Sequence, residues 1–291
     1  MGQKVLVTGA SGLIGRELCK QLMQQGYYVV AVDNNFRYDH IPNCKEYIRS
    51  EIVDFLSQED NNYDFVFHMG NINGTKYFYD IPNQLLQSNI QADFAVFDFV
   101  KQNDKCKLLY ASSSEVVAGS TEFPTTEETN VTIENIHNPR WSYRLGKLVG
   151  ENYLTNSDLN YTILRFFNVF GPASGSGHFV RDVLNKLDKH DYTLIGASET
   201  RSFCRVEDAV DAVISVFKLT AREVINIGSS EEITVLEAAE IIAAHKGVKP
   251  KWELLPGNPG SVSRRKPSLQ KLRRYYPTFN PAKFKDAIKD L

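Results

Sequence analysis

Residues 4–15 read KVLVTGASGLIG, an apolar strand that leads directly into three glycines and then into a segment of helical period. Gly9 permits the tight turn out of the strand, Gly12 lets the backbone approach a phosphate, and Gly15 lets the helix pack closely on the sheet. The N-terminus of that helix, with free N–H groups and a partial positive charge, points at the anion. The stretch therefore predicts a turn that holds a pyrophosphate, the alternative being an ordinary strand-to-helix turn.

Size, composition and charge are those of an ordinary globular protein. The chain has 291 residues, enough for a large core, and its 33 basic and 35 acidic residues give a net charge of -2. The sequence contains no secretory signal pattern and no apolar run long enough to span a bilayer. We therefore expect a cytoplasmic protein that binds neither nucleic acid nor membrane. The four cysteines and six histidines lack metal-ligand spacing, so we expect free thiols and no metal.

Strand-like and helix-like segments alternate along the first part of the chain. This alternation predicts an α/β fold with a doubly wound parallel sheet, the Rossmann arrangement. The predicted strands are residues 4–8, 28–32, 65–69, 107–111 and 161–166, and the predicted helices are residues 13–25, 83–102 and 142–154. After Gly171-Pro172 the pattern changes to loops and short elements. We therefore predict a dinucleotide-binding domain at residues 1–170 and a smaller C-terminal substrate-binding lobe at residues 171–291, partly interleaved with the first.

The predicted helix at residues 83–102 has an apolar face that is broader than one packing contact needs. The apolar residues are Leu85, Leu86, Ile90, Phe94, Val96, Phe97 and Phe99. We expect part of this face to meet a partner subunit, the alternative being burial within the chain.

Asp33 closes the second predicted strand, 18 positions after Gly15. A carboxylate at this place accepts hydrogen bonds from both hydroxyls of an adenosine ribose, which favours NAD over NADP. Arg37 is near enough in sequence to weaken that preference. The alternative for Asp33 is a turn residue next to Asn34 and Asn35.

Tyr143 and Lys147 are four residues apart in a segment of helical period, so their side chains share one face. A free phenol titrates near ~10, and a phenol that acts as a base near neutral pH needs a pKa lowered by roughly 3 units. An adjacent ammonium group and a positively charged nicotinamide ring would supply this shift. The alternative is an exposed Tyr/Lys pair without a chemical role.

Short motifs follow one another in a characteristic order along nearly the whole chain. They are TGASGLIG at residues 8–15, YASSSEV at 110–116, YRLGK at 143–147, LRFFNVFGP at 164–172, RSFCRVED at 201–208 and NIG at 226–228. With these motifs the chain resembles the extended short-chain dehydrogenase/reductases of the nucleotide-sugar epimerase and dehydratase kind. The resemblance implies NAD as cofactor, a nucleoside diphosphate sugar as substrate, and a homodimer through the helices at residues 83–102 and 142–154.

The resemblance also assigns catalytic roles. Tyr143 would exchange a proton with a sugar hydroxyl while the attached carbon passes a hydride to the nicotinamide. Lys147 would hold the nicotinamide ribose and lower the pKa of Tyr143.

A serine hydroxyl would complete the catalytic set, and two serines fit. Counting from Glu115-Val116 selects Ser113, which we prefer, whereas counting back from Gly119 selects Ser114. The alternative for this serine cluster is local hydrogen bonding at a turn.

The binding residues implied by the resemblance fall into two sets. The cofactor set is Gly9, Ser11, Gly12, Leu13, Ile14, Gly15, Asp33, Asn34, Asp54, Lys147 and Phe166. The substrate set is Asn71, Asn168, Arg201 and Arg265, because guanidinium groups suit a diphosphate. Ser268 stands where relatives often carry an aspartate, which weakens the assignment of Arg265, and the basic run around it is alternatively a solvated surface.

One segment departs from the pattern of the family. His68-Met69-Gly70-Asn71 replaces a histidine followed by small residues, and residues 73–77 form an unusual loop that we expect near the sugar or the nicotinamide. We interpret His68 as a buried structural residue rather than a base.

The leading hypothesis is a 4-epimerase that oxidises C4 of the sugar and returns the hydride to the opposite face. A 4,6-dehydratase or decarboxylase would form the same 4-keto intermediate, and Glu115 is the reason to consider it, although a dehydratase normally has an acid where Ser114 stands. Further alternatives are a net 4-oxidoreductase and a non-catalytic dinucleotide sensor.

Overall fold

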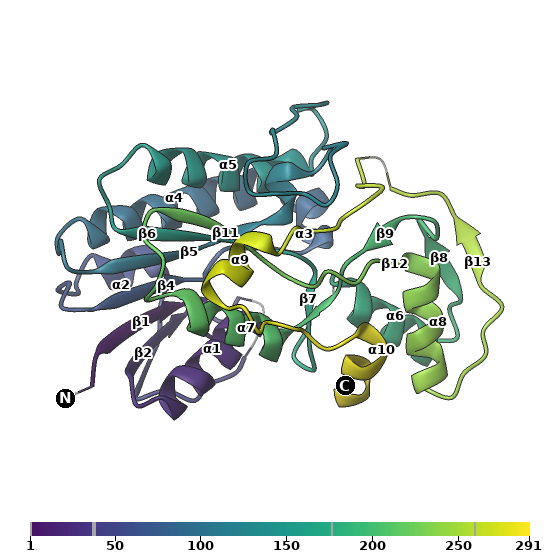
Figure 1. The fold of residues 1–291 in the computed structure, drawn as a ribbon, viewed down its shortest axis with the longest axis horizontal. Helices are drawn as coiled ribbons and strands as arrows, with labels where there is room; N and C mark the ends of the chain where they lie inside the picture. Colours follow the sequence, from purple (N-terminus) through teal and green to yellow (C-terminus); the bar gives the residue numbers. More distant parts are fainter. Residues whose placement is uncertain (1, 37–38, 176, 259) are drawn as a thin grey trace.

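A parallel sheet forms the centre of the molecule (Figure 1). The structure is a computed structural model that describes every residue except 1, 37–38, 176 and 259. Over the described residues the sheet has seven strands: β1 (Lys4–Thr8), β2 (Tyr28–Asp33), β3 (Glu46–Arg49), β4 (Phe65–His68), β5 (Lys107–Ser113), β6 (Tyr161–Phe166) and β11 (Glu223–Ile227). Their order is β11-β6-β5-β4-β1-β2-β3, with every neighbouring pair parallel. The predicted α/β doubly wound fold is therefore confirmed.

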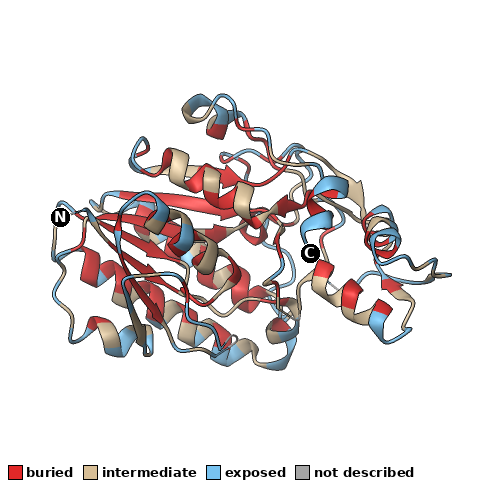
Figure 2. Cartoon of the chain, turned by 90° about the horizontal axis from the view of Figure 1, so that it is seen from below, coloured by how far each residue is buried: buried red, intermediate tan, exposed pale blue. Residues whose placement is uncertain are grey.

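Helices cover both faces of this sheet. One face carries α1 (Leu13–Gln24), α7 (Val206–Val216) and α9 (Gln270–Tyr275), and the other carries α2 (Ile52–Leu56), α4 (Pro82–Val100) and α5 (Trp141–Thr155). Side chains alternate along β1, so that Val5 and Val7 pack on the first face and Leu6 on the second. Both faces are buried, as Figure 2 shows by the red strands beneath helices whose outer surfaces are exposed.

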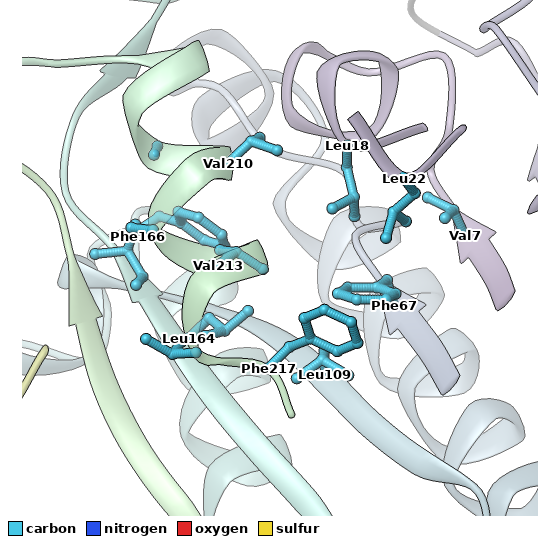
Figure 3. Close-up of a cluster of buried hydrophobic side chains, with 14 of the residues drawn as sticks. Val7, Leu18, Leu22, Phe67, Leu109, Leu164, Phe166, Val210, Val213 and Phe217 are labelled. Carbon is cyan, nitrogen blue, oxygen red and sulfur yellow. The ribbon is translucent and has the colours of Figure 1, made fainter. Parts of the chain in front are cut away.

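The core under α1 and α7 fixes the position of the glycine-rich turn. Leu18 and Leu22 of α1 and Val210 and Val213 of α7 converge on the sheet around Phe217 (Figure 3). The ring of Phe217 lies edge-on to Phe65 with centroids 4.9 Å apart, and 5.3 Å from the ring of Phe67. This packing of α1 on the sheet places the N-terminus of the helix at the carboxyl end of β1.

The broad apolar face of α4 is largely buried within the chain. Leu85, Val96, Phe97, Phe99 and Val100 are all buried. Phe97 stacks on Tyr153 of α5 at 5.1 Å, and Phe94 meets the same ring edge-on at 4.9 Å. Burial within the chain therefore accounts for these residues, whereas Leu86, Ile90 and Phe94 are only partly buried, and the homodimer stays a prediction.

A second, smaller lobe has its own apolar core around Phe170, Phe203 and Phe284, and it lies at the carboxyl ends of the strands. Its elements are β7 (Val169–Phe170), α6 (Phe179–Asp188), β8 (Thr193–Ile195), β9 (Thr200–Arg201), β10 (Cys204–Arg205), β12 (Ile233–Thr234), α8 (Val235–His245), β13 (Glu253–Leu255) and α10 (Phe284–Ala287). Between them the chain returns to the large sheet through α7 and β11. The two parts therefore exchange elements, and we keep the boundary near residue 170 as a proposal.

The strand order reverses between β1 and β4, because the chain leaves β1 toward β2 and β3 on one side and continues through β4 and β5 on the other. Ligands of open α/β sheets bind at the carboxyl ends of the strands at such a point. None of the helices in the described residues is long and apolar enough to cross a membrane.

Two glycines of α5 test how closely this helix lies on the sheet. A Cβ at Gly150 would stand 2.2 Å from the Tyr110 hydroxyl, whereas a Cβ at Gly146 would meet nothing closer than Leu86 at 3.9 Å. We expect Gly150→Ala to lower the free energy of unfolding by about 1–3 kcal/mol, because the core there is overpacked. The matched change Gly146→Ala should raise it by ~0.5–1 kcal/mol, because alanine favours the helix. Urea unfolding of both variants measures this, and equal stabilities would contradict the close packing of α5.

Candidate active site

The glycine-rich turn has the geometry of a phosphate cradle. Gly9 has φ +65°, and a Cβ there would lie 2.5 Å from the Cα of Gly70. A Cβ at Gly15 would lie 2.2 Å from the Gly9 carbonyl oxygen, so α1 can pack this closely only without a side chain. A Cβ at Gly12 would approach only that same oxygen, at 3.2 Å, and otherwise the residue faces the cavity. Gly12 therefore leaves room for a ligand rather than for the protein.

Gly70 explains the unusual segment after β4. A Cβ on Gly70 would stand 2.9 Å from the backbone nitrogen of Gly9 and 2.5 Å from Ile52. The ends of β1 and β4 thus meet through two glycines placed back to back. The prediction of a loop at residues 73–77 is wrong in one respect, because the helix α3 (Thr75–Asp80) begins within this segment. Gly74, just before the helix, has φ +124°. Asn73, Gly74 and Thr75 line the cavity.

A cavity of about 1140 Å³ runs from the glycine-rich turn to the smaller lobe. Sites for one small ligand are commonly about 300–1,000 Å³, so this space suits a dinucleotide together with a second ligand. Almost all the predicted binding residues line it: Gly9, Gly12, Leu13, Ile14, Gly15, Asp33, Asn34, Asp54, Asn71, Lys147, Phe166, Asn168, Arg201 and Arg265. Ser11 does not line it and is buried behind the turn, where its hydroxyl donates to the His40 carbonyl oxygen.

Asp33 lies at the end of β2 and lines the same cavity as the glycine-rich turn. Its carboxylate accepts backbone N–H groups of Ser11 at 3.0 Å and Asn35 at 2.7 Å. Burial raises the pKa of Asp33, and these two N–H groups oppose the rise. Asn34 donates to Glu51, which also lines the cavity and which the sequence did not single out. Arg37 lies outside the described residues.

Tyr143 and Lys147 are both buried on the cavity side of α5, as their spacing predicts. The ring of Tyr143 stacks on Phe78 of α3 with centroids 5.0 Å apart. The Lys147 ammonium donates to the Asn71 side-chain oxygen and to the Tyr110 hydroxyl at 3.4 Å. Burial lowers the pKa of Lys147, while the nearby carboxylates Asp93 and Glu151 raise it. Asn71, which we expected to bind substrate, uses its amide to position Lys147.

The three serines at the end of β5 have different partners. Ser112 donates to Glu151 at 2.5 Å. Ser113 caps the short 3-10 helix η1 (Ser114–Val117) by accepting the Glu115 N–H at 3.2 Å. Ser114 is buried and accepts a hydrogen bond from Arg265 at 3.3 Å. All three serines line the cavity, and Ser113 is the one of them that is not fully buried.

Glu115 is clamped between two arginines. Arg140, at the start of α5, donates to both of its oxygens at 3.2 and 2.5 Å, and Arg265 from the C-terminal segment donates to Oε1. Burial alone would raise the pKa of Glu115, but the two guanidinium groups hold it far below its usual range. Glu115 is therefore an anion at neutral pH. Sequence reasoning missed Arg140, although it stands one helical turn before Tyr143.

The remaining predicted substrate residues lie where the lobe faces the cavity. Arg201 is paired with Glu199 at 2.5 Å, and burial together with the charge of Arg265 lowers the pKa of Arg201 to about 10. The Nε of Arg265 is buried without a hydrogen-bond partner among the described residues. Asn168 adopts φ +38° and donates to the Ser202 carbonyl oxygen. Two arginines that repel each other, one with an unused donor, form a site for an anion such as a diphosphate.

The sequence predicts no metal site in the chain. The described residues contain no group of three or more histidine, cysteine, aspartate or glutamate side chains arranged to hold a metal ion. His68 is buried, and its ring nitrogens contact Thr8 and Asp93, so it belongs to the interior behind Lys147.

Comparisons with known proteins agree with this geometry. Residues 5–228 match the model of the NAD dependent epimerase/dehydratase family. The chain is 29% identical over 295 residues to a UDP-N-acetyl-alpha-D-glucosaminuronate decarboxylase of Bacillus cytotoxicus, covering 94% of this chain and 91% of that protein. It is 27% identical to UDP-glucuronic acid decarboxylase 1 of Danio rerio, covering 93% of this chain and 67% of that one.

A solved structure of a UDP-galactose 4-epimerase superposes with a TM-score of 0.83 at 25% identity, over 99% of this chain and 97% of the other. Epimerases and decarboxylases thus both occur among the proteins that this chain is similar to. The glycine cradle, Asp33 and the buried Tyr143–Lys147 pair are residues that fit NAD. The chain therefore belongs to the NAD dependent epimerase/dehydratase family and is an NAD-dependent enzyme of the extended short-chain dehydrogenase/reductase type.

Proposed function

We propose that this enzyme oxidises C4 of a nucleoside diphosphate-linked uronic acid and releases the C6 carboxyl group as CO2. The observation that carries the proposal is the clamp of Arg140 and Arg265 on Glu115. Three guanidinium groups, including Arg201, share the two carboxylates Glu115 and Glu199, which leaves one positive charge in excess. That excess suits an anionic substrate such as a nucleoside diphosphate sugar.

The state of Glu115 separates the candidate reactions. A 4,6-elimination needs a base that removes the C5 proton, and a carboxylate held by two guanidinium groups is a poor base because its proton affinity is low. Decarboxylation needs no such base. Once C4 is a ketone, the C5–C6 bond breaks, CO2 leaves, and the electron pair moves into the carbonyl to give an enolate. This enolate takes a proton from water at C5. Two decarboxylases among the similar proteins support this choice.

The residues of this chain take separate roles in the proposal. Tyr143 accepts the proton of the C4 hydroxyl, Ser113 hydrogen-bonds the same oxygen, and Lys147 stabilises the phenolate and holds the nicotinamide ribose. When bound, NAD supplies the hydride acceptor for C4. Arg201 and Arg265 hold the diphosphate, and the Phe78 ring fixes the plane of Tyr143.

Epimerisation at C4 is the second candidate. It shares the C4 ketone, and the wide cavity leaves space for the keto sugar to present its other face. The similarity to a UDP-galactose 4-epimerase supports it. A homodimer in the cytoplasm is part of both proposals.

Product masses distinguish these reactions. The protein with NAD is incubated with UDP-glucuronic acid, UDP-N-acetylglucosaminuronic acid, UDP-glucose and UDP-galactose, and the products are measured by mass spectrometry and nicotinamide absorbance. We expect a uronic acid to lose CO2, because the C4 ketone activates the C5–C6 bond. A sustained rise in nicotinamide absorbance would indicate that the keto product is released. A constant absorbance together with CO2 loss would indicate that the hydride returns to the ketone before the product is released. An isomer of equal mass or loss of water, with no CO2 from either uronic acid, would contradict the proposal.

Tyr143→Phe should lower turnover by about 10²–10⁴-fold, because the proton acceptor is lost while the ring can still stack on Phe78. NAD affinity, measured by calorimetry, should stay close to that of the wild type. Tyr153→Phe is the matched control, since Tyr153 lies on the same helix among the rings of Phe94 and Phe97. Wild-type turnover in Tyr143→Phe would remove Tyr143 from the mechanism.

Glu115→Gln should lower the free energy of unfolding at pH 7 by ~3–5 kcal/mol, because two buried guanidinium groups lose their carboxylate. The pKa of Glu115 is depressed in the folded state, so its contribution is complete above the unfolded pKa near ~4.3 and is lost as the pH falls through the folded pKa. The difference from the wild type should therefore narrow below about pH 4.

Urea unfolding at pH 7 and at low pH measures this effect. Glu128→Gln is the control, because Glu128 is exposed and pairs with Lys271 at 3.8 Å. A Glu115→Gln protein as stable as the wild type at pH 7 would show that the clamp does not hold Glu115 as an anion.

A further inference from the structure

Asp93 is a buried carboxylate to which the proposed chemistry assigns no role. It lies on α4 with 1% of its surface exposed. Its Oδ1 is 2.8 Å from His68 Nε2 and accepts the Asn71 amide at 3.0 Å, and its Oδ2 accepts the Tyr110 hydroxyl at 2.6 Å. Three elements of the cofactor domain therefore converge on this one side chain.

Two of these partners also hold Lys147. The ammonium group donates to Asn71 Oδ1 and to the Tyr110 hydroxyl, and it lies 4.5 Å from the centre of the Tyr110 ring. Asn71 and Tyr110 thus each link the ammonium to the carboxylate by one intervening group. A continuous hydrogen-bonded path joins Lys147, at the cavity, to Asp93, behind it.

The other carboxylate near Lys147 is already neutralised. Glu151, one turn further along α5, accepts two hydrogen bonds from Arg165 of β6 at 2.9 and 2.7 Å and one from Ser112. A buried ammonium group without a counter-charge is costly and tends to lose its proton. Among the described residues, Asp93 is the carboxylate that the network connects to Lys147 without an arginine of its own.

We propose that Asp93 is a positioning residue of the reaction, which acts through Asn71 and Tyr110 to keep Lys147 an ammonium group aimed at the nicotinamide ribose. The inference rests on the Tyr143–Lys147 role in the proposed function but not on the identity of the product. Burial raises the pKa of Asp93, and Lys147, His68 and Tyr110 together bring it below its usual value. The Asp93 side chain is therefore an anion at neutral pH.

The groups that face Lys147 set the sign of the expected effect. They are Asp93 on α4, Tyr110 on β5 and Glu151 on α5. His68 of β4 lies behind Asp93, Arg165 of β6 lies behind Glu151, and Tyr143 stands one turn earlier on α5. Burial lowers the pKa of Lys147 and the charge of Asp93 raises it. Removing that charge therefore lets the ammonium lose its proton at lower pH.

Asp93→Asn tests the proposal without a substrate. The full chain is labelled with ¹³C at lysine Cε, the Lys147 signal is assigned by its loss in Lys147→Arg, and its titration is followed by NMR. We expect the Lys147 titration to move down by about one pH unit or more in Asp93→Asn. Calorimetry should show that the NAD affinity of the variant falls at a correspondingly lower pH than that of the wild type. In the pH range where Lys147 has lost its proton in the variant but not in the wild type, the variant should bind NAD up to about tenfold more weakly.

Asp98→Asn is the matched control on the same helix. Asp98 is exposed and pairs with Lys101 at 3.0 Å, so the Lys147 titration should not move. A merely structural role of Asp93 would lower thermal stability and leave both the titration and the pH dependence of NAD affinity unchanged, which would overturn the proposal. These readouts need no turnover, so they stand or fall separately from the decarboxylation.

Tyr110→Phe decides the question if Asp93→Asn fails to fold. It keeps the buried ring and removes the hydroxyl that links Lys147 to Asp93. We expect a smaller shift in the same direction, and an unchanged Lys147 titration in this variant would equally overturn the proposal.

Discussion

A buried ammonium group constrains the architecture of this active site. Lys147 is 3% exposed, and a charge at such depth is stable only with hydrogen-bond acceptors and a counter-charge close by. The acceptors come from the loop after β4 and from β5, and a nearby carboxylate that pairs with no arginine, Asp93, comes from α4. Helices α4 and α5 must therefore lie together on one face of the sheet, with α5 close enough to β5 that Gly150 has no space for a side chain. The same packing turns Tyr143 toward the cavity.

The elements with strong local signals could be predicted from the sequence. Local sequence patterns predict, to within a few residues, the first strand with its glycines, the long amphipathic helices and the Tyr143–Lys147 pair. The strands β3 and β11 were not predicted, and β11 pairs with β6 from far along the chain. Such pairing depends on contacts that no local window contains.

The parts of the site that sequence reasoning missed are those that depend on contacts between distant residues. Asp93 stands four residues after Asn89 on the buried stripe of α4, and a carboxylate on that stripe was the available signal. Gly70 is required because Gly9 and Ile52, both distant in sequence, lie against it. Arg140 and Arg265 reach Glu115 from residues 25 and 150 positions away, so the change of Glu115 from possible base to fixed anion is visible only in three dimensions.

Cofactor chemistry and substrate choice are separated in space. In the proposed function, the cofactor lies against the glycine-rich turn of the large sheet, whereas the arginines Arg201 and Arg265 come from the smaller lobe and its C-terminal segment. A crystal structure of the enzyme with NAD bound tests the account most directly. It predicts the pyrophosphate at the Gly9–Gly15 turn and the nicotinamide ribose within hydrogen-bond distance of Lys147, with the ring facing Tyr143. A nicotinamide ring turned away from both side chains would contradict it.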